Sequence, residues 1–281
     1  MKPLLLALLA GLGVFILAVL TKTARHDRDW QPHLARTPGV DVDGSVWQIS
    51  PIRDWTYTPE GPDETRWLAS ARIDTERVER VWLVLEPHPG IPAMAHTLVL
   101  FEFDNGDLIG LTIEARKERG EKFAPLRGAM NRFELIYVWA TPRDLLTRRA
   151  VMLGHELELY PLDLTRAQAR AFLASVLGRT AGIEAKARFY NTALSNCTNE
   201  LAKAADLSWD PAFIFTGGAA EALHKRGIIA GEDFESAQAA AQVADWVREN
   251  GNLPHTVFDC SLLERVATTT VIPFCKMTDS Q

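Results

Sequence analysis

Two side chains of this sequence have the chemistry of a thiol nucleophile and its base. Cys197 lies within residues 195–201 (SNCTNEL), and His96 opens an earlier segment, residues 95–101 (AHTLVLF). A thiol at a helix N-terminus beside an imidazolium has its pKa lowered from about 8.5 to about 3.5–7.5. Asn196 is a good capping residue type, so we expect Cys197 in a first helical turn, where free N–H groups would hold an oxyanion. The alternative for a lone cysteine or histidine is a buried or hydrogen-bonded structural residue.

The elements that would position these residues change from strands to helices along the chain. The best-defined strands are 96–103 and 108–116, a hairpin around Asn105-Gly106, because these two residues tolerate the positive φ of a tight turn. Further strands are predicted at 46–49, 54–57, 80–86, 134–140 and 156–161. Helices are predicted at 164–178, 197–206 and 217–249. This order predicts an α+β fold, with an antiparallel sheet packed with helices.

The first segment favours a membrane anchor. Residues 3–20 carry no charge, and as a helix they would span about 27 Å, close to the hydrocarbon thickness of a bilayer. The run is long for a signal peptide and lacks a small-x-small exit, so an uncleaved transmembrane helix is favoured over a cleaved signal. The expected organisation is an anchor or signal segment at 1–22, an extended linker at 23–45, a main domain at 46–211 and a helical C-terminal extension at 212–281, packed on the same domain.

Composition and cysteine usage limit the possible partners and cofactors. The net charge is −6 and the basic residues are scattered, which argues against nucleic-acid binding. In an oxidising compartment Cys260 and Cys275 would pair and leave Cys197 free, although three unpaired cysteines are the alternative. We predict no catalytic metal and no cofactor. Four of the other histidines have no metal-ligand spacing among them: His88, His155, His224 and His255.

Four segments in order resemble the Lnb N-terminal periplasmic domain family, formerly a domain of unknown function. They are residues 96–103, 112–121, 133–137 and 189–198, and the resemblance covers roughly residues 80–205. The family is similar to permuted NlpC/P60-like thiol enzymes, in which the histidine precedes the cysteine. The resemblance implies a papain-like core, with Cys197 on a helix facing His96 on the sheet. His96 would take the thiol proton, and Cys197 would attack an acyl carbon to form a thioester.

The resemblance also implies a third group that orients the imidazole, and Glu114 matches a motif position on the paired strand. A two-residue turn would pair position 97 with 114 and place Glu114 on the face opposite His96, unless a bulge shifts the register. The structural alternative for Glu114 is an ion pair with Arg116 or Arg119.

Three further residues are candidates for substrate binding. Arg116, with its charged neighbours, would bind a head group, or would simply belong to a solvated strand end. Tyr190 and Asn196 precede the nucleophile and would line its pocket, or would pack the turn.

The predicted function is a single-pass protein of the bacterial inner membrane, with its main domain in the periplasm, that performs thiol-dependent acyl transfer. Its substrate would be a phospholipid or lipoprotein. The alternatives are a cysteine amidase or endopeptidase acting on peptidoglycan, and a non-catalytic periplasmic binding or structural domain.

Overall fold

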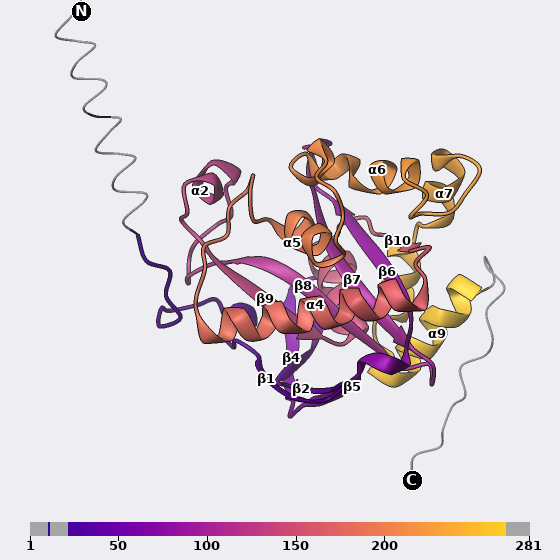
Figure 1. Cartoon of the computed structure of the whole chain (residues 1–281), viewed down its shortest axis with the longest axis horizontal. Coiled ribbons are helices and arrows are strands. Elements are labelled where there is room, and N and C mark those ends of the chain that lie inside the picture. Colours follow the sequence, from indigo (N-terminus) through magenta and orange to yellow (C-terminus); the bar gives the residue numbers. More distant parts are fainter. Residues whose placement is uncertain (1–10, 12–21, 268–281) are drawn as a thin grey trace, which may run out of the picture.

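The apolar alternation of the sequence forms one large mixed sheet in the computed structural model, which describes residue 11 and residues 22–267 (Figure 1). Neighbouring strands are antiparallel except β3 and β9, which pair in parallel at Arg53 and Ala140. The protein is therefore α+β, with the predicted sheet mixed at this one junction. Within the described residues the order of the sheet is β10 (Glu158–Pro161), β6 (Val78–Pro87), β7 (Ala95–Phe103), β8 (Leu108–Arg116), β9 (Glu134–Ala140), β3 (Ile52–Thr58) and β4 (Gly61–Leu68).

A smaller antiparallel sheet lies at the lower edge of the molecule in Figure 1. Ile49 and Ile73 from this sheet are buried in the main apolar core. The small sheet therefore closes one end of that core. In the described chain its strands are β1 (Gly39–Asp43), β2 (Val46–Ser50) and β5 (Ala71–Asp74).

Helices bury both faces of the large sheet. Phe172 and Leu201 pack on one face, against Val99 and Phe101. Val247 and Phe258 pack on the other face. On the first face lie α4 (Arg166–Ala185), α5 (Cys197–Ala204), α6 (Ala219–Lys225) and α7 (Phe234–Ala240); on the second lie α3 (Pro142–Thr147), the π-turn η3 (Arg148–Met152), α8 (Ala244–Asn250) and α9 (His255–Ala267). The described part of the C-terminal extension thus contributes to the packing of both faces.

Short helical turns connect these layers. The helix α2 (Pro125–Ala129) precedes β9, and the remaining turns are 3-10 helices: η1 (Pro32–Leu34), η2 (Thr75–Arg77), η4 (Pro211–Phe213) and η5 (Thr216–Gly218).

The N-terminal part of the chain differs from the extended linker expected at 23–45. Trp30 and Leu34 are buried, and Leu34 packs with Ile136 and Val138 of β9. Burial of these apolar side chains holds the segment against the domain. Among the described residues no helix is long and apolar enough to cross a membrane. Apart from Gly11, the predicted span at residues 3–20 lies outside them.

The turn between β7 and β8 is one residue longer than expected. Glu102 pairs with Leu108, and the Phe103 N–H bonds the Asp107 carbonyl at 3.0 Å, so a three-residue turn closes the hairpin. Gly106 ends this turn at φ 84°, a left-handed conformation that favours glycine. The longer turn shifts the register by one residue, which puts position 96, and not 97, opposite 114.

A buried ion pair joins β3 to α3. The Arg53 guanidinium donates to both carboxylate oxygens of Asp144 at 2.7–3.0 Å, and the Trp55 N–H donates to Asp144 at 2.7 Å. Both charged side chains are almost fully buried. Removal of one partner would leave the other as an uncompensated buried charge.

We predict that Asp144→Ala lowers the free energy of unfolding by about 3–5 kcal/mol, because the Arg53 charge stays buried without its carboxylate. Chemical denaturation of the full chain in detergent measures this change. Glu79→Ala is the matched control, because it removes an exposed ion pair with Arg166 and should cost about 0–1 kcal/mol. Equal losses in the two variants would contradict the role assigned to the buried pair.

Candidate functional site

Cys197 is the first residue of α5, and Asn196 is the N-cap of this helix. The Asn196 side chain accepts a hydrogen bond from the Asn199 N–H at 2.7 Å, which satisfies one free donor of the first turn. Its amide nitrogen donates to the carbonyls of Thr192 and Phe213, each at 2.8 Å. The cap therefore fixes the helix start, while the predicted role of Asn196 in substrate binding stays a prediction.

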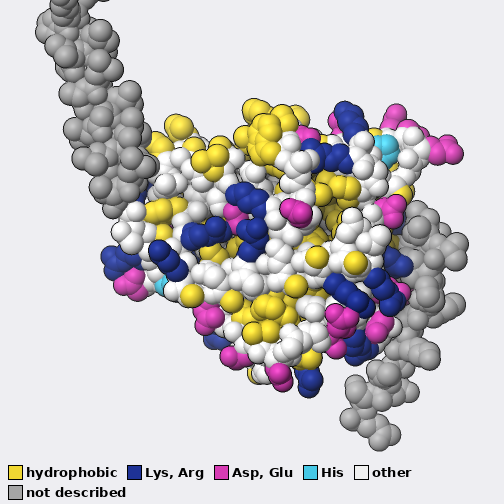
Figure 2. All heavy atoms as spheres, viewed as in Figure 1, with side chains coloured by type: hydrophobic (Ala, Val, Ile, Leu, Met, Phe, Trp, Pro, Cys, Tyr) yellow, Lys and Arg dark blue, Asp and Glu magenta, His cyan; other side chains and the backbone are white. Residues whose placement is uncertain are grey.

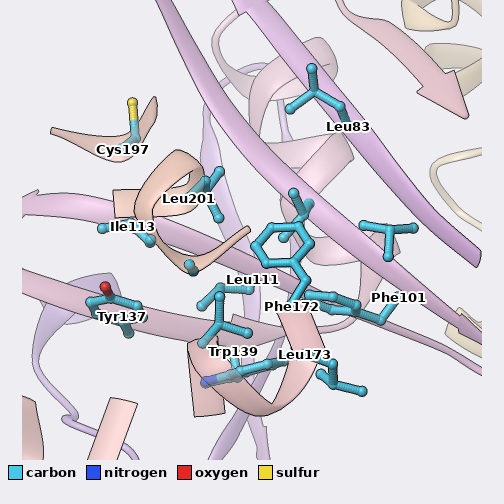
Figure 3. Packing of buried hydrophobic residues seen from close by; sticks show 14 of the residues in the cluster. Leu83, Phe101, Leu111, Ile113, Tyr137, Trp139, Phe172, Leu173, Cys197 and Leu201 are labelled. Carbon is cyan, nitrogen blue, oxygen red and sulfur yellow. The ribbon is translucent and has the colours of Figure 1, made fainter. Parts of the chain in front are cut away.

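The Cys197 thiol is free and 4% exposed. Its sulfur lies 3.8 Å from the Thr198 hydroxyl, which in turn lies 3.0 Å from the hydroxyl of Thr97 on β7. This hydroxyl pair fastens the start of α5 to the strand that carries His96. Figure 3 shows the sulfur pointing away from the neighbouring core side chains Leu201 and Ile113.

His96 lies where β7 and β8 separate. The pairing of these strands ends at Leu98 and Thr112, although both strands continue. The His96 Nε2 atom lies 2.7 Å from the Thr112 hydroxyl and 3.4 Å from a Glu114 carboxylate oxygen. The imidazole therefore bridges the two strands beyond their last backbone pair. The observed register puts His96 and Glu114 on the same face, in contrast to the register expected for a two-residue turn.

Arg149 of η3 fixes the polar groups that hold the imidazole. The Thr112 hydroxyl donates to Glu114 at 3.0 Å, and the Arg149 guanidinium donates to Glu114 at 3.0 Å and to Thr112 at 3.2 Å. The Glu114 carboxylate thus pairs with Arg149 and His96. The alternative ion partners, Arg116 and Arg119, bond elsewhere.

A second carboxylate completes the surroundings of Arg149. The guanidinium donates to Glu86 at 2.8 Å and to the Leu145 carbonyl at 2.8 Å. The His155 Nδ1 atom lies 2.5 Å from the other Glu86 oxygen. Burial raises the pKa of Glu86, but the charge of Arg149 and the bond with His155 outweigh burial, so the pKa is lowered. Arg149 is therefore held between two ionised carboxylates.

These charges shift the pKa values of the nucleophile pair in opposite directions. Burial raises the pKa of Cys197, but the His96 charge, a hydrogen bond with its imidazole and hydrogen bonds with Thr97 lower it from 9.0 to about 7. Burial lowers the pKa of His96, but the charges of Glu114 and Cys197 raise it to about 10. When the pH lies between these two pKa values, Cys197 is a thiolate and His96 is an imidazolium. Burial raises the pKa of Glu114, but the charge of His96, the hydrogen bond with its imidazole and the charge of Arg149 together hold this pKa well below its usual range.

Tyr190 is brought to the site. Its ring is buried and packs edge-on against Phe123. Burial raises the pKa of its hydroxyl well above the usual value, and the negative charges of Cys197 and Glu114 raise it further. The phenol therefore stays neutral within the electrostatic field of the thiol.

Arg116 is not brought to Cys197. Its guanidinium donates to the carbonyls of Leu34 and Ala35 at 2.9 and 2.8 Å and stacks 4.4 Å from the Trp30 ring centre. Burial lowers its pKa to about 10. Arg116 fastens the N-terminal segment to β8, and a role in substrate binding remains a prediction.

An apolar pocket lies between the large sheet and helices α5 and α6. Its cavity volume is about 40 Å³. Thr97 and Thr198 are the polar residues of its lining, and Cys197, which precedes Thr198, is not part of that lining. The apolar lining includes Leu83, Val99, Phe172, Leu201, Ala205, Phe213 and Leu223. A cavity of this size has room for only a few water-sized groups, so a larger ligand would enter only if the lining side chains moved apart.

Sequence reasoning missed Arg149, Thr112 and Glu86 as parts of the site. Thr112 and Glu114 are two residues apart on one strand and therefore share a face, which is a readable signal. Arg148 and Arg149 interrupt the otherwise largely apolar segment 145–153, but the partners of Arg149 are distant in sequence. Cys275, the predicted disulfide partner of Cys260, lies outside the described residues, so their pairing stays a prediction.

The arrangement has the groups that thiol-mediated acyl chemistry requires. Cys197 presents a thiol at a helix N-terminus, and His96 presents an imidazole held by Thr112 and Glu114. The small pocket next to α5 offers an apolar lining near the first turn of this helix.

Comparison with protein families places this site in a known domain. Residues 64–222, more than half of the chain, match the model of the Lnb N-terminal periplasmic domain. The search of curated proteins and the search of solved structures found no match. The matched region includes His96, Glu114, Tyr190 and Cys197, and it confirms the resemblance inferred from the sequence. The chain belongs to the Lnb N-terminal periplasmic domain family.

Proposed function

We propose that this protein is a thiol-dependent acyl-transfer enzyme of the cell envelope. The observation that carries the proposal is the position of Cys197 at the start of α5, beside an imidazole held by Thr112 and Glu114. The buried Arg149 guanidinium fixes the carboxylate that holds this imidazole. We assign Cys197 as nucleophile, His96 as acid and base, and Glu114 as the group that orients the imidazole.

The first half-reaction forms a thioester. The Cys197 thiolate attacks the carbonyl carbon of an acyl ester, and the N–H groups of Cys197 and Thr198 stabilise the oxyanion that forms. When the carbon–oxygen bond breaks, the His96 imidazolium gives its proton to the leaving alkoxide. Because Nε2 is bonded to Thr112, we assign this proton to Nδ1. The products are an acyl-Cys197 thioester and an alcohol.

The second half-reaction returns the enzyme to its starting state. Neutral His96 removes a proton from an incoming amine or water, which attacks the thioester carbon. The carbon–sulfur bond breaks, and Cys197 leaves as a thiolate beside the imidazolium. An amine acceptor gives an amide, and water gives a free acid. The substrate-binding assignment of Tyr190 belongs to this proposal, because its neutral hydroxyl lies in the field of the thiolate.

The fold supports a structural relationship with papain-like and permuted NlpC/P60-like thiol enzymes. In the described chain, a helix that begins with the cysteine packs on an antiparallel hairpin that carries the histidine. The histidine precedes the cysteine in sequence, which is the permuted order. We propose this relationship on the arrangement of α5, β7 and β8.

The apolar pocket favours a lipid-like acyl donor over peptidoglycan. Its lining past Thr198 offers apolar side chains to a hydrocarbon chain and few hydrogen-bonding partners to a sugar or a peptide. The apolar run at residues 3–20 would hold the domain at the inner membrane, facing the periplasm, where phospholipids and lipoproteins are accessible. We therefore propose a phospholipid or a lipoprotein as the acyl donor.

Thiol alkylation tests the activated nucleophile. We predict that the rate of Cys197 alkylation by iodoacetamide rises through a midpoint near pH 7, since the thiolate is the reactive form and its pKa is about 7. Mass spectrometry of the Cys197 peptide measures the rate. His96→Ala should move the midpoint upward, because burial then acts without the opposing charge. His224→Ala, which changes a distant imidazole, should leave it in place. If the pH midpoint is the same in His96→Ala as in the parent protein, the proposed dyad of Cys197 and His96 is wrong.

Acyl trapping tests the reaction and the donor. We predict that the full chain, incubated with phospholipid vesicles without an amine acceptor, gains an acyl-sized mass on Cys197 that hydroxylamine removes. Ala205→Phe should reduce this adduct several-fold for long-chain donors and spare short-chain donors, because residue 205 lines the apolar pocket. Cys197→Ala sets the background. Cleavage of muropeptides without lipid adducts would support the amidase alternative, and no reaction with either would support a non-catalytic domain.

Arg149 provides a test of the positioning network. We predict that Arg149→Lys lowers the acylation rate about 10–100-fold, because lysine keeps the charge but cannot bridge Glu86 and Glu114. The same substitution should raise the alkylation midpoint of Cys197, which a loss of packing alone would not do. Arg148→Lys, at the adjacent position, is the control. If the two substitutions have equal effects, Arg149 contributes only positive charge, and its proposed role as a bridge between Glu86 and Glu114 is wrong.

A further inference from the structure

Five large apolar side chains protrude from separate connections around the start of α5, and we name them the apolar crest. Each of these side chains is exposed, whereas core side chains are buried. The five residues come from four segments of the described chain. The crest consists of Ile91 (41% exposed), Leu126 (72%), Leu194 (70%), Trp209 (64%) and Phe215 (63%). Exposed apolar groups that are gathered in one place mark an interaction surface.

Hydrogen bonds from side chains and from the backbone join these segments into one edge of the molecule. Near Leu194, the Thr192 hydroxyl donates to the Pro125 carbonyl of α2 at 2.7 Å. Near Phe215, the Phe213 carbonyl accepts a bond from the cap of α5, and the Gly217 N–H donates to the Ala93 carbonyl at 3.2 Å.

Figure 2 shows hydrophobic side chains along the upper edge of the molecule, in the region where Figure 1 draws α2 and α6. The small sheet of β1, β2 and β5 lies at the opposite edge. The crest is therefore a feature of one side of the domain.

The N-terminal chain meets the domain beside this crest. The predicted membrane span ends at residue 20, and the Lys22 ammonium donates to the Met130 carbonyl at 3.3 Å. Met130 is the C-cap of α2, the helix that carries Leu126. Two residues of extended chain cover at most about 7 Å. A span that ends at residue 20 therefore brings α2 close to the membrane surface.

Basic side chains flank the crest. Glu200 is a single buried carboxylate that pairs with Arg179, Arg188 and Lys203, which leaves this cluster positively charged. The Lys203 ammonium also donates to the Leu194 carbonyl at 2.7 Å, within the crest. Such a border of positive charge complements lipid phosphates.

We propose that the apolar crest docks onto a phospholipid bilayer that contains anionic lipids. Leu126, Leu194 and Phe215 enter the interfacial layer, while the basic cluster around Glu200 contacts lipid phosphates. Docking turns the start of α5, with its thiol, towards the membrane surface. This inference rests on the exposed side chains and the predicted span, and it is independent of the chemistry proposed for Cys197.

Quenching by brominated lipids tests the docked state. Trp209 is the most exposed tryptophan of the described chain, so lipids brominated on their acyl chains should quench its emission in the full chain reconstituted into phosphatidylethanolamine and phosphatidylglycerol vesicles. We expect Trp209→Phe to remove the quenched component. Substitution of Leu126, Leu194 and Phe215 together by serine should also abolish quenching of Trp209.

The controls separate docking from other outcomes. Val42→Ser removes an apolar side chain that is 59% exposed on β1, at the opposite edge, and should leave quenching unchanged. Circular dichroism checks that each variant is folded. Cys197→Ala should quench like the parent protein, so failure of the proposed catalysis would not affect this result. Equal Trp209 emission in brominated and ordinary lipids would overturn the proposal. A change in Trp209 emission that appears only at high protein density would also overturn it, because it would indicate that the crest contacts a second copy of the protein.

Discussion

The Arg149 guanidinium is buried where the ends of three elements meet, and the site depends on its two carboxylate partners. Burial of a charge costs several kcal/mol unless opposite charges and hydrogen bonds compensate for it. Glu86 at the end of β6 and Glu114 near the end of β8 provide this compensation. The requirement to neutralise one cation therefore fixes two strand ends against η3, and it turns the Glu114 carboxylate towards His96.

The separation of β7 from β8 explains how one thiol interacts with two successive strand residues. Neighbouring residues on a strand point to opposite faces, so His96 and Thr97 would normally face different layers. The charge of His96 acts on the Cys197 thiol, and the Thr97 hydroxyl is joined to the start of α5 through the Thr198 hydroxyl. This is feasible where the strand has lost its neighbour on that side, beyond Leu98 and Thr112. The imidazole then replaces the missing backbone contacts between the strands.

The sequence was sufficient to predict the hairpin and the helix that begins at Cys197, because turn and capping residues are local signals. The register was not predictable from Asn105-Gly106 alone, since the same residues fit a two-residue turn and the three-residue turn that ends at Gly106. That single residue decides whether Glu114 faces His96. Arg149 was beyond the reach of local patterns, because its partners are brought together by the sheet. The burial of the N-terminal segment was not predicted for the same reason, because Leu34 packs against β9, which is distant in sequence.

The helix cap connects the thiol to the exposed surface around it. Asn196 donates to the carbonyls of Thr192 and Phe213, and these residues lie on the two connections that carry Leu194 and Phe215. A displacement of either connection would therefore shift the Asn196 cap. The cap sets the direction of the N–H groups beside the thiol. The pair of charges at Cys197 and His96 tolerates little displacement, because hydrogen bonds depend steeply on distance and angle. Contact at the crest would therefore bear on the geometry of the nucleophile without any residue of the crest touching it.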